Sequence, residues 1–274
     1  MKTRLITLMV LLSLCVVGME AKVKGNGKII TKEVNISDYN SLRVGGNVSW
    51  NNNSFNIKND KQGPTFHYSQ KSGAPSLSIT IDENLFSLLE INCANGKLSI
   101  NVEKNQQIVP TKMQIVSNSS ELRKLDISGA IDFSLETPLK GQMLEVRSSG
   151  ASDVYMDQSV RVDECELRSS GASDLKFGDL TCNTIRVENS GASDVTLNGK
   201  ASSGEFNASG SSDIKAYDFV LKELTCKASG SSDIKTHVTE RLDASASGSS
   251  DIKYKGNPKA NTKTSSASDI DQVR

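Results

Sequence analysis

The stretch "SSGASDVYM", residues 148–156, is repeated through the second half of this chain. It returns as "SSGASDLKF" from residue 169, "NSGASDVTL" from 189, "ASGSSDIKA" from 208, "ASGSSDIKT" from 228 and "ASGSSDIKY" from 246. A degenerate copy, "SGAID", begins at residue 128, and "SSASD" at residue 265 has lost its glycine. Successive aspartates of the motif lie 18 to 21 residues apart. A repeat of this period predicts equivalent structural units stacked on one another.

Apolar residues hold fixed places on both sides of the motif. Four residues after the glycine stand Phe133, Val154, Leu175, Val195, Ile214, Ile234 and Ile252. Four residues before it stand Leu125, Val146, Leu167, Val187, Phe206, Cys226 and Ala244. Apolar residues also recur at alternate positions further out in most copies. This period of two predicts strands with one buried face, and no stretch of the repeat holds the 3.6-residue period of a helix.

A unit of about 20 residues with two or three short strands cannot bury its own apolar face. Stacking equivalent units does bury it. The repeat therefore predicts an all-β fold, a single-stranded parallel β-helix (β-solenoid) with rungs of about 18–21 residues. Antiparallel hairpins are the alternative. They would place equivalent residues on alternating strands, so they explain the in-phase columns less well.

The first half of the chain has the same alternation in a less regular form. Strand-like segments here are "GKIITKEVNI", "NSLRVGGNVSW", "NSFNIKN", "PSLSITI", "GKLSINVE" and "TKMQIVS". We interpret residues 22–120 as earlier, irregular rungs or a β cap, and residues 121–274 as the regular rungs of one continuous domain, 22–274. "DENLFSLLE", residues 82–90, is predicted to contain one short helical turn, which would help to cover the open end of a solenoid.

The N-terminus predicts export. Lys2 and Arg4 precede the uncharged apolar run "LITLMVLLSLCVV", which has the length of a signal-peptide core and is short for a membrane span. Residues 1–21 are therefore predicted to be a Sec signal peptide, which places the protein in the periplasm, on the outer-membrane surface or outside the cell. Lipidation at Cys15 is the alternative to ordinary cleavage, but Leu14 occupies a position where such signals usually carry Gly or Ala.

Charge and cysteine content narrow the function classes. Lys plus Arg and Asp plus Glu both number 32, so the chain has no basic field that would favour nucleic acid. No later segment is apolar enough to predict a transmembrane helix in the mature chain. Four cysteines remain after signal removal: Cys93, Cys165, Cys182 and Cys226. Cys165 and Cys226 fall on inward columns and are predicted to be buried thiols, whereas a Cys93–Cys182 disulfide stays open.

The motif glycines and aspartates carry the candidate chemistry. The glycines are predicted to form structural turns at the corner of each rung: Gly150, Gly171, Gly191, Gly210, Gly230 and Gly248. Stacked carboxylates one rung apart would repel each other by about 1 kcal/mol in water. We expect hydrogen bonds from nearby backbone N–H and serine hydroxyl groups, as in an Asx-type turn, to offset this repulsion. The next lysines could add a basic column: Lys176, Lys215, Lys235 and Lys253.

Calcium is the alternative explanation for the aspartate column. The weak candidate ligands are Asp153, Asp174, Asp194, Asp213, Asp233 and Asp251. The repeat lacks the glycine-rich nonapeptide of known calcium-binding β-rolls, so the turn interpretation is favoured and no cofactor is predicted.

No catalytic residues are predicted. The chain has two histidines, His67 and His237, and neither lies in a recognisable nucleophile arrangement; each is interpreted as an exposed strand or loop residue. Some β-helix proteins cleave polysaccharides, but an active site needs one rung to differ from its neighbours, whereas the repeat is uniform. A polysaccharide lyase or hydrolase is therefore the alternative and not the main prediction.

The segments "GNGKIITKEVNISDYNSLRVGGNVSW", "LRKLDISGAIDFSL" and the reiterated "SGASDV/SGSSDIK" resemble the head-GIN putative (auto-transporter) adhesin family of Bacteroidota. The resemblance covers residues 25–272. It implies an exported, β-helical cell-envelope protein that acts as an adhesin or binding scaffold without catalysis, with glycans or envelope and surface proteins as possible partners. The alternative function is a polysaccharide-active enzyme or calcium-dependent glycan binder on the same scaffold. No catalytic residues carry over from the family.

Overall fold

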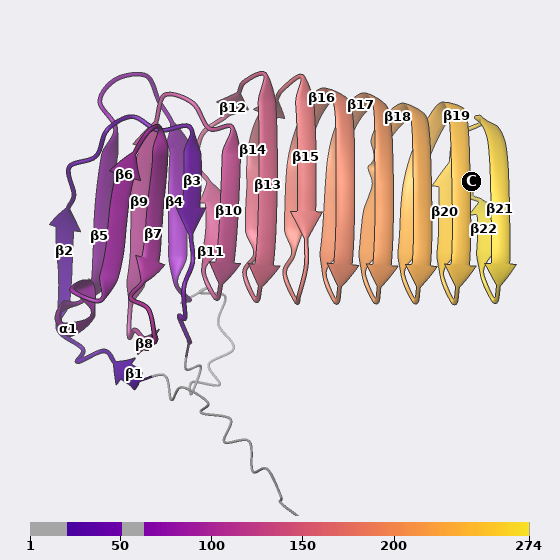
Figure 1. Cartoon of the computed structure of the whole chain (residues 1–274). Coiled ribbons are helices and arrows are strands. Elements are labelled where there is room, and N and C mark those ends of the chain that lie inside the picture. The colour runs from indigo at the N-terminus through magenta and orange to yellow at the C-terminus, as the bar shows by residue number, and fades with distance from the viewer. Residues whose placement is uncertain (1–20, 51–62, 274) are drawn as a thin grey trace, which may run out of the picture.

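A computed structural model describes residues 21–50 and 63–273 of the chain. Apart from one helix of four residues, its regular elements are strands, and they form a β-solenoid of about seven turns (Figure 1). The predicted parallel β-helix is therefore confirmed. The predicted signal peptide, apart from Ala21, and Cys15 within it lie outside the described residues.

Each regular rung runs from one motif glycine to the next. The strands of the early regular rungs are β10 (Lys124–Gly129), β11 (Asp132–Leu135), β12 (Leu139–Lys140), β13 (Met143–Gly150), β14 (Val154–Arg161) and β15 (Glu164–Ser169). The later ones are β16 (Leu175–Gly191), β17 (Asp194–Gly210), β18 (Asp213–Gly230), β19 (Asp233–Gly248), β20 (Asp251–Lys255), β21 (Lys259–Ser266) and β22 (Asp269–Gln272). Strands β16 to β19 are single, continuous strands of 16 to 18 residues, where the sequence predicts two or three short strands per rung.

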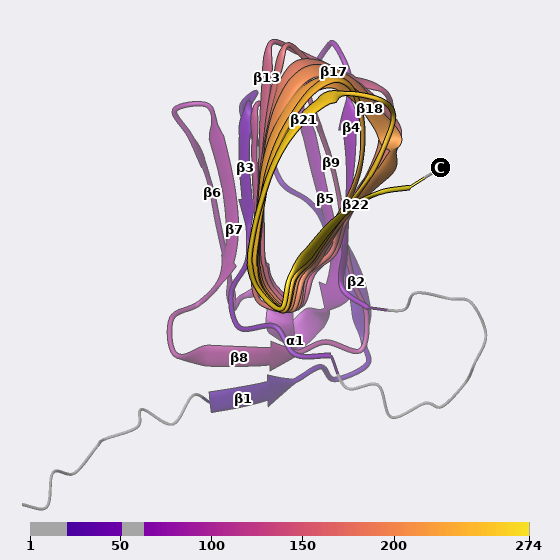
Figure 2. The same ribbon diagram turned by 90° about the vertical axis from the view of Figure 1, so that its right-hand side faces the viewer.

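The motif glycine forms the corner of each rung up to Gly248, and Ser266 takes the equivalent place in the last rung, with φ +66°. The view along the solenoid shows the corners superposed at one edge (Figure 2). Gly191 has φ +84°, a conformation that side chains other than glycine rarely adopt. A Cβ atom added there would lie 2.7 Å from the carbonyl oxygen of Gly171 in the preceding rung. The corner thus requires glycine both for its backbone angle and for the close approach of the next rung.

A column of buried serines ties the corner from inside. Ser173 is fully buried, and its hydroxyl donates a hydrogen bond to the carbonyl of Ser170 at 2.9 Å. The hydroxyl oxygens of Ser173 and Ser169 are also within hydrogen-bond distance of each other, at 2.9 Å. In the rungs of Ser212, Ser232 and Ser250 the residue that matches Ser169 is alanine. There the serine hydroxyl reaches a carbonyl of the preceding rung, as Ser232 does to Ala208 at 3.1 Å. Every copy can therefore keep a buried hydroxyl because a carbonyl is always within reach.

The core consists of the predicted inward columns stacked in parallel register. Leu175 pairs with Val195, which pairs with Ile214, which pairs with Ile234, and all are buried. On the facing sheet, Val187 pairs with Phe206, which in turn pairs with Cys226. Each apolar residue therefore contacts its equivalents above and below as well as the opposite sheet.

The N-terminal part contains one further in-phase rung and an antiparallel cap. Its strands are β1 (Ala21–Lys24), β2 (Ile29–Glu33), β3 (Ser41–Val44), β4 (Thr65–Gln70), β5 (Ser76–Asp82), β6 (Leu89–Ala94), β7 (Lys97–Val102), β8 (Gln106–Val109) and β9 (Met113–Ser119). Strand β3 pairs in parallel with both β7 and β10, and β4 with both β9 and β11. The β3–β4 rung is thus inserted between strands that come later in the chain. Strands β2, β5 and β6 add antiparallel pairs at the outer end.

The predicted helical turn is α1 (Glu83–Phe86), which lies at the corner end of the cap. Asp82, just before it, is fully buried and accepts hydrogen bonds from the backbone N–H of Gly27 and of Thr111, both at 2.8 Å. The Thr111 hydroxyl donates a third, at 2.7 Å. One carboxylate therefore joins the β1–β2 connection, the β5–α1 junction and the β8–β9 connection.

Candidate functional site

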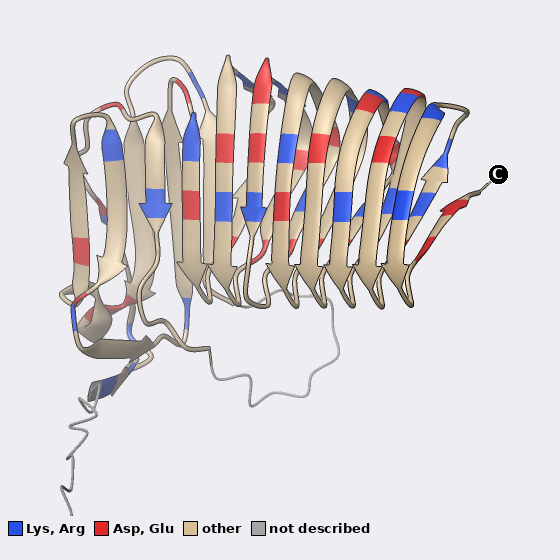
Figure 3. Cartoon of the chain, turned by 45° about the vertical axis from the view of Figure 1, so that its right-hand side comes forward, with Lys and Arg blue, Asp and Glu red and all other residues tan. Residues whose placement is uncertain are grey.

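The sheet that precedes each glycine presents a self-neutralised charged surface. Arg168 forms ion pairs with Glu166 at 2.6 Å and with Glu188 of the next rung at 3.1 Å, and Arg186 continues the series to Glu205 at 2.8 Å. Figure 3 shows acidic and basic residues alternating across neighbouring strands. Because these charges pair with one another, this sheet offers little field for a charged ligand.

The sheet that follows each glycine carries the aspartates in one outward row, which we call the Asp row. Its members are Asp132, Asp153, Asp174, Asp194, Asp213, Asp233, Asp251 and Asp269. Asp153 Oδ1 accepts a hydrogen bond from the backbone N–H of Asp174 at 3.1 Å, and Asp174 Oδ1 accepts one from the N–H of Asp194 at 3.1 Å. The expected Asx-type bond within the same turn is therefore replaced here by a bond to the next rung.

The Asp row is only partly neutralised. Lys215 pairs with Asp194 at 2.5 Å, whereas Lys176 pairs instead with Asp157, at 3.4 Å. Burial, together with the charges of Asp153 and Asp194, holds the pKa of Asp174 above its ordinary value. Among the residues that the structure describes, no group of three or more His, Cys, Asp or Glu side chains is arranged to hold a metal ion.

A second outward row runs beside the Asp row and extends into the cap. From β9 to β18 it consists of Val116, His67, Ser134, Tyr155, Lys176, Thr196 and Lys215, each paired with the next. The members on β16 to β18 are lysine or threonine. Those on β9, β4, β11 and β14 are all different, so the repeat is broken at the junction between the cap and the regular rungs.

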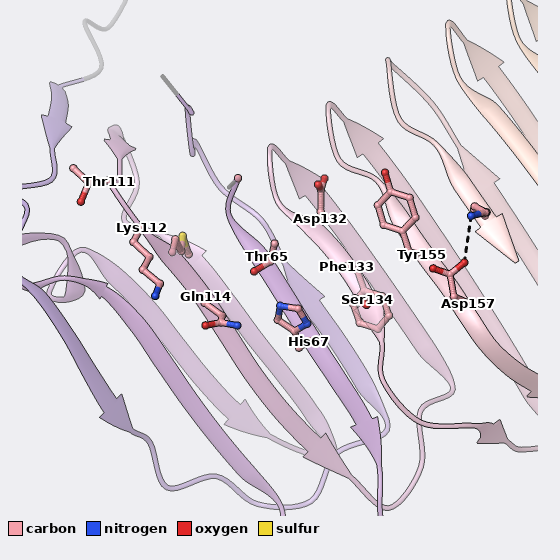
Figure 4. Close-up of a pocket in the computed structure, with 13 residues that line it drawn as sticks. Thr65, His67, Thr111, Lys112, Gln114, Asp132, Phe133, Ser134, Tyr155 and Asp157 are labelled. Carbon is pink, nitrogen blue, oxygen red and sulfur yellow. Dashed lines mark ion pairs between the residues drawn. The ribbon is translucent and has the colours of Figure 1, made fainter. Parts of the chain in front are cut away.

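A groove of about 730 Å³ lies at this junction (Figure 4). We call it the junction groove. It is lined by Gly63, Thr65, His67, Thr111, Lys112, Met113, Gln114, Asp132, Phe133, Ser134, Tyr155, Asp157 and Lys176. Most of these side chains belong to four adjacent strands, β9, β4, β11 and β14. Ser134 is small and stands between the rings of His67 and Tyr155 in the second row, which leaves space above it.

Neighbouring groups hold the groove side chains in place. His67 Nδ1 lies 2.7 Å from Glu136 Oε1. Although burial acts to raise the pKa of Glu136, hydrogen bonds with His67 and Ser134 bring it below its ordinary value. The Tyr155 hydroxyl donates to Asp153 at 2.9 Å, and burial together with this bond raises the pKa of Tyr155, which stays a neutral phenol. The groove therefore combines fixed rings, uncharged hydroxyl and amide groups, and charged side chains of both signs.

The sequence alone does not predict this groove. His67, predicted to be an exposed strand or loop residue, lies half-buried on β4 beside residues from three other segments. The available signal was the departure of Ser134 and Tyr155 from the lysine and threonine of later copies. The partners Thr65, His67 and Gln114 could not be assigned to the same place without the pairing of β4 with β9 and β11.

The other sequence candidates form no site of their own. The four cysteines among the described residues are free thiols, so Cys93 and Cys182 form no disulfide, and Cys93 is the partly exposed one. Burial raises the pKa of Cys182 and of Cys226 to about 12, which leaves both thiols protonated and unreactive at neutral pH. The six candidate calcium ligands are spread one per rung along the Asp row. His237 lies at the opposite end of the solenoid from His67, beside Lys255.

Comparison with known proteins gives the family context. The family model "Putative auto-transporter adhesin, head GIN domain" matches residues 62–176 and 156–258. A solved structure from Parabacteroides merdae, named a putative adhesin, is 26% identical with TM-score 0.81, over 93% of this chain and 100% of that one. One from Parabacteroides distasonis, named a putative lipid binding protein, is 30% identical with TM-score 0.76, over 92% and 100%. No curated protein matched, and no helix in the described residues is long and apolar enough to cross a membrane.

Proposed function

Because this chain belongs to the family of the putative auto-transporter adhesin head GIN domain, we propose that it is an exported, non-catalytic adhesin of the cell envelope that binds surface glycans in the junction groove. Export rests on the basic start and apolar core of residues 1–21. The periplasm, the outer-membrane surface and the medium are all compatible with that signal.

The observation that carries the proposal is the break in the repeat. Along the regular rungs, equivalent residues occupy equivalent positions and make the same kinds of contact, so the outer surface repeats from rung to rung. The junction groove is a hollow where ring-bearing and uncharged polar side chains meet in an arrangement that no other rung copies. Such a hollow, with a few convergent polar groups, is the kind of place where proteins bind ligands.

Glycans fit this lining better than lipids do. Thr65, Gln114 and Ser134 offer hydroxyl and amide groups that can both donate and accept hydrogen bonds, as sugar hydroxyls require. Tyr155 adds an apolar ring face. Among the described residues, buried apolar side chains pack between the two sheets, so an acyl chain in the solenoid interior would have to displace them. The name of the Parabacteroides distasonis relative makes lipid vesicles a necessary comparison.

The test is binding of the full chain to a glycan array, followed by affinity measurement for the best ligand. Tyr155→Ala should weaken binding by about tenfold, the equivalent of about 1.4 kcal/mol. Tyr217→Ala is the matched control, because Tyr217 lies outside the groove. The Lys255 Nζ lies over the Tyr217 ring, 4.8 Å from the ring centre. Binding to lipid vesicles and to no glycan, or equal loss in both variants, would count against the proposal.

We further propose that the adhesin needs no calcium. The candidate carboxylates are spread along the row, and several already accept hydrogen bonds from the backbone. The melting temperature should therefore be the same in millimolar calcium and in chelator. An increase of several degrees in calcium would show that the Asp row holds the ion.

A further inference from the structure

We propose that the junction groove holds an extended, uncharged oligosaccharide that lies along the solenoid axis, with one sugar ring seated over Ser134 between His67 and Tyr155. The inference rests on the proposed glycan-binding function and specifies the ligand's length, charge and orientation. Four features of the groove carry it.

The first feature is the slot above Ser134. His67, Ser134 and Tyr155 occupy successive positions of one outward row, on the adjacent strands β4, β11 and β14. Neighbouring strands are about 4.8 Å apart, so the backbones that carry His67 and Tyr155 are separated by about 9–10 Å. The serine between them is the smallest side chain of the three. The slot therefore has about the width of one ring, with the Tyr155 strand on one side and the His67 strand on the other (Figure 4).

The second feature is the length of the groove and its direction. Its lining begins at Gln114 on β9 and ends at Lys176 on β16, with β4, β11 and β14 between them. Four strand spacings correspond to about 19 Å measured across the strands. The volume of about 730 Å³ matches a ligand of several rings and exceeds what one monosaccharide would fill. Because the strands run around the solenoid, a ligand that follows the groove lies parallel to the axis.

The third feature is charge balance. Lys176 is paired with Asp157 at 3.4 Å, and His67 is within hydrogen-bond distance of Glu136. Lys112, just before β9, and Asp132, on β11 in the middle of the groove, add one basic and one acidic group. Charges of both signs are therefore present, without an excess that would attract an anionic or cationic polymer. A polymer of either charge would meet groups of its own sign in the groove, a cost that an uncharged ligand avoids.

The fourth feature is the pairing of the strands beneath the groove. Strands β9, β4, β11 and β14 are interior strands. They pair with one another in parallel, β14 pairs on its other side with β16 in parallel, and β9 pairs on its other side with β5 in the antiparallel direction. Their backbone N–H and C=O groups are used in the sheet, so an extended peptide cannot add itself as a further strand here. Recognition must come from side chains, which favours a ligand with its own dense array of hydroxyl groups.

The first experiment is a length series. The full chain is titrated with neutral oligosaccharides of one to six residues from the glycan class that the array identifies, and with anionic oligosaccharides of matched length. Affinity for the neutral series should rise by at least tenfold between the monosaccharide and the chain that spans the groove, then level off. Equal affinity at every length, or preferential binding of the anionic series, would overturn the inference.

The second experiment fills the slot. Ser134→Trp places a large ring above the floor of the groove and should reduce affinity for the longest neutral oligosaccharide by at least a hundredfold. Thr196→Trp is the matched control, because Thr196 lies in the same outward row on β17, beyond the groove. It should bind as the parent does, and both variants should melt as the parent does. Retained binding in Ser134→Trp, or equal loss in Thr196→Trp, would overturn the placement.

The two proposals fail in different ways. If no glycan of any length binds, the proposed adhesin function through this groove is wrong, and the further inference falls with it. If a monosaccharide binds as well as a hexasaccharide and Tyr155→Ala still weakens it, the groove binds glycans but not extended chains. If long chains bind but Ser134→Trp does not disturb them, they bind elsewhere on the solenoid.

Discussion

At the scale of a residue, the corner glycine is the position that the solenoid can least change. We expect Gly191→Ala to destabilise the protein by at least 1–2 kcal/mol, because alanine disfavours φ +84° and its Cβ would lie 2.7 Å from Gly171 O. Gly27→Ala is the control. Gly27 has φ +77° but no atom within 4 Å of an added Cβ, so it reports the cost of the backbone angle alone. Chemical denaturation measures both, and equal losses would show that the stacking contact contributes nothing.

The Asp row makes a second prediction at this scale. The pKa of Asp174 is raised by burial and by its charged neighbours, so its ionised form destabilises the fold above that pKa, and stability returns as the pH falls through it. Asp174→Asn keeps an oxygen that can accept the N–H of Asp194 and removes the charge. We therefore expect a higher denaturation midpoint at pH 7. Asp194→Asn should show no such gain, because it loses its ion pair with Lys215. A lower midpoint for Asp174→Asn would contradict this account.

At the scale of an element, the N-terminal cap depends on one buried carboxylate. Burial acts to raise the pKa of Asp82, but the hydrogen bonds from Thr111 and Gly27 bring it below the ordinary value. Its stabilising contribution is therefore complete above the unfolded-state pKa, about 4, and is lost as the pH falls through the folded-state value. Hydrogen exchange of β1 and β2 should increase over this acid range before the regular rungs respond.

Asp82→Asn provides the control for the cap. The amide offers one oxygen where the carboxylate has two, so the bonds from Gly27 and Thr111 cannot all be kept. We expect exchange in β1 and β2 to be fast at pH 7 already and to change little on acidification. A variant whose cap is protected at pH 7 and still loosens in acid would show that another group controls the transition.

Also at this scale, the repeat determines how far the fold can be predicted from the sequence. Stacking of Val187, Phe206 and Cys226 follows from their equal distance to a glycine, because each rung meets the same requirement as its neighbours. The β3–β4 rung carries no motif, and its neighbours β7, β9, β10 and β11 come later in the chain. Its place depends on long-range pairing, which local alternation does not encode. The groove arises at that rung, so it could not be predicted either.

At the scale of the whole molecule, structure and proposed function occupy different parts of one stack. Rungs from β16 onward contact only their neighbours, so the stability of such an array is close to a sum over rungs and interfaces. The junction groove uses side chains up to Lys176 and nothing beyond. A change in the number of regular rungs should therefore alter stability and leave ligand affinity unchanged.

Removing a whole rung tests this separation. Deletion of residues 194–212 joins Ser193 to Asp213, so β18 can take the place of β17 against β16, with Gly230 stacked on Gly191. We expect a folded protein with a lower melting temperature and glycan affinity within about twofold of the parent. Deletion of residues 132–152 removes one rung inside the groove, Ser134 included, and brings Tyr155 beside His67, which eliminates the slot. That variant should fold and lose binding. If the first deletion abolished glycan binding, or if the second variant still bound glycan, the ligand would bind to the repeated surface and not to the junction groove.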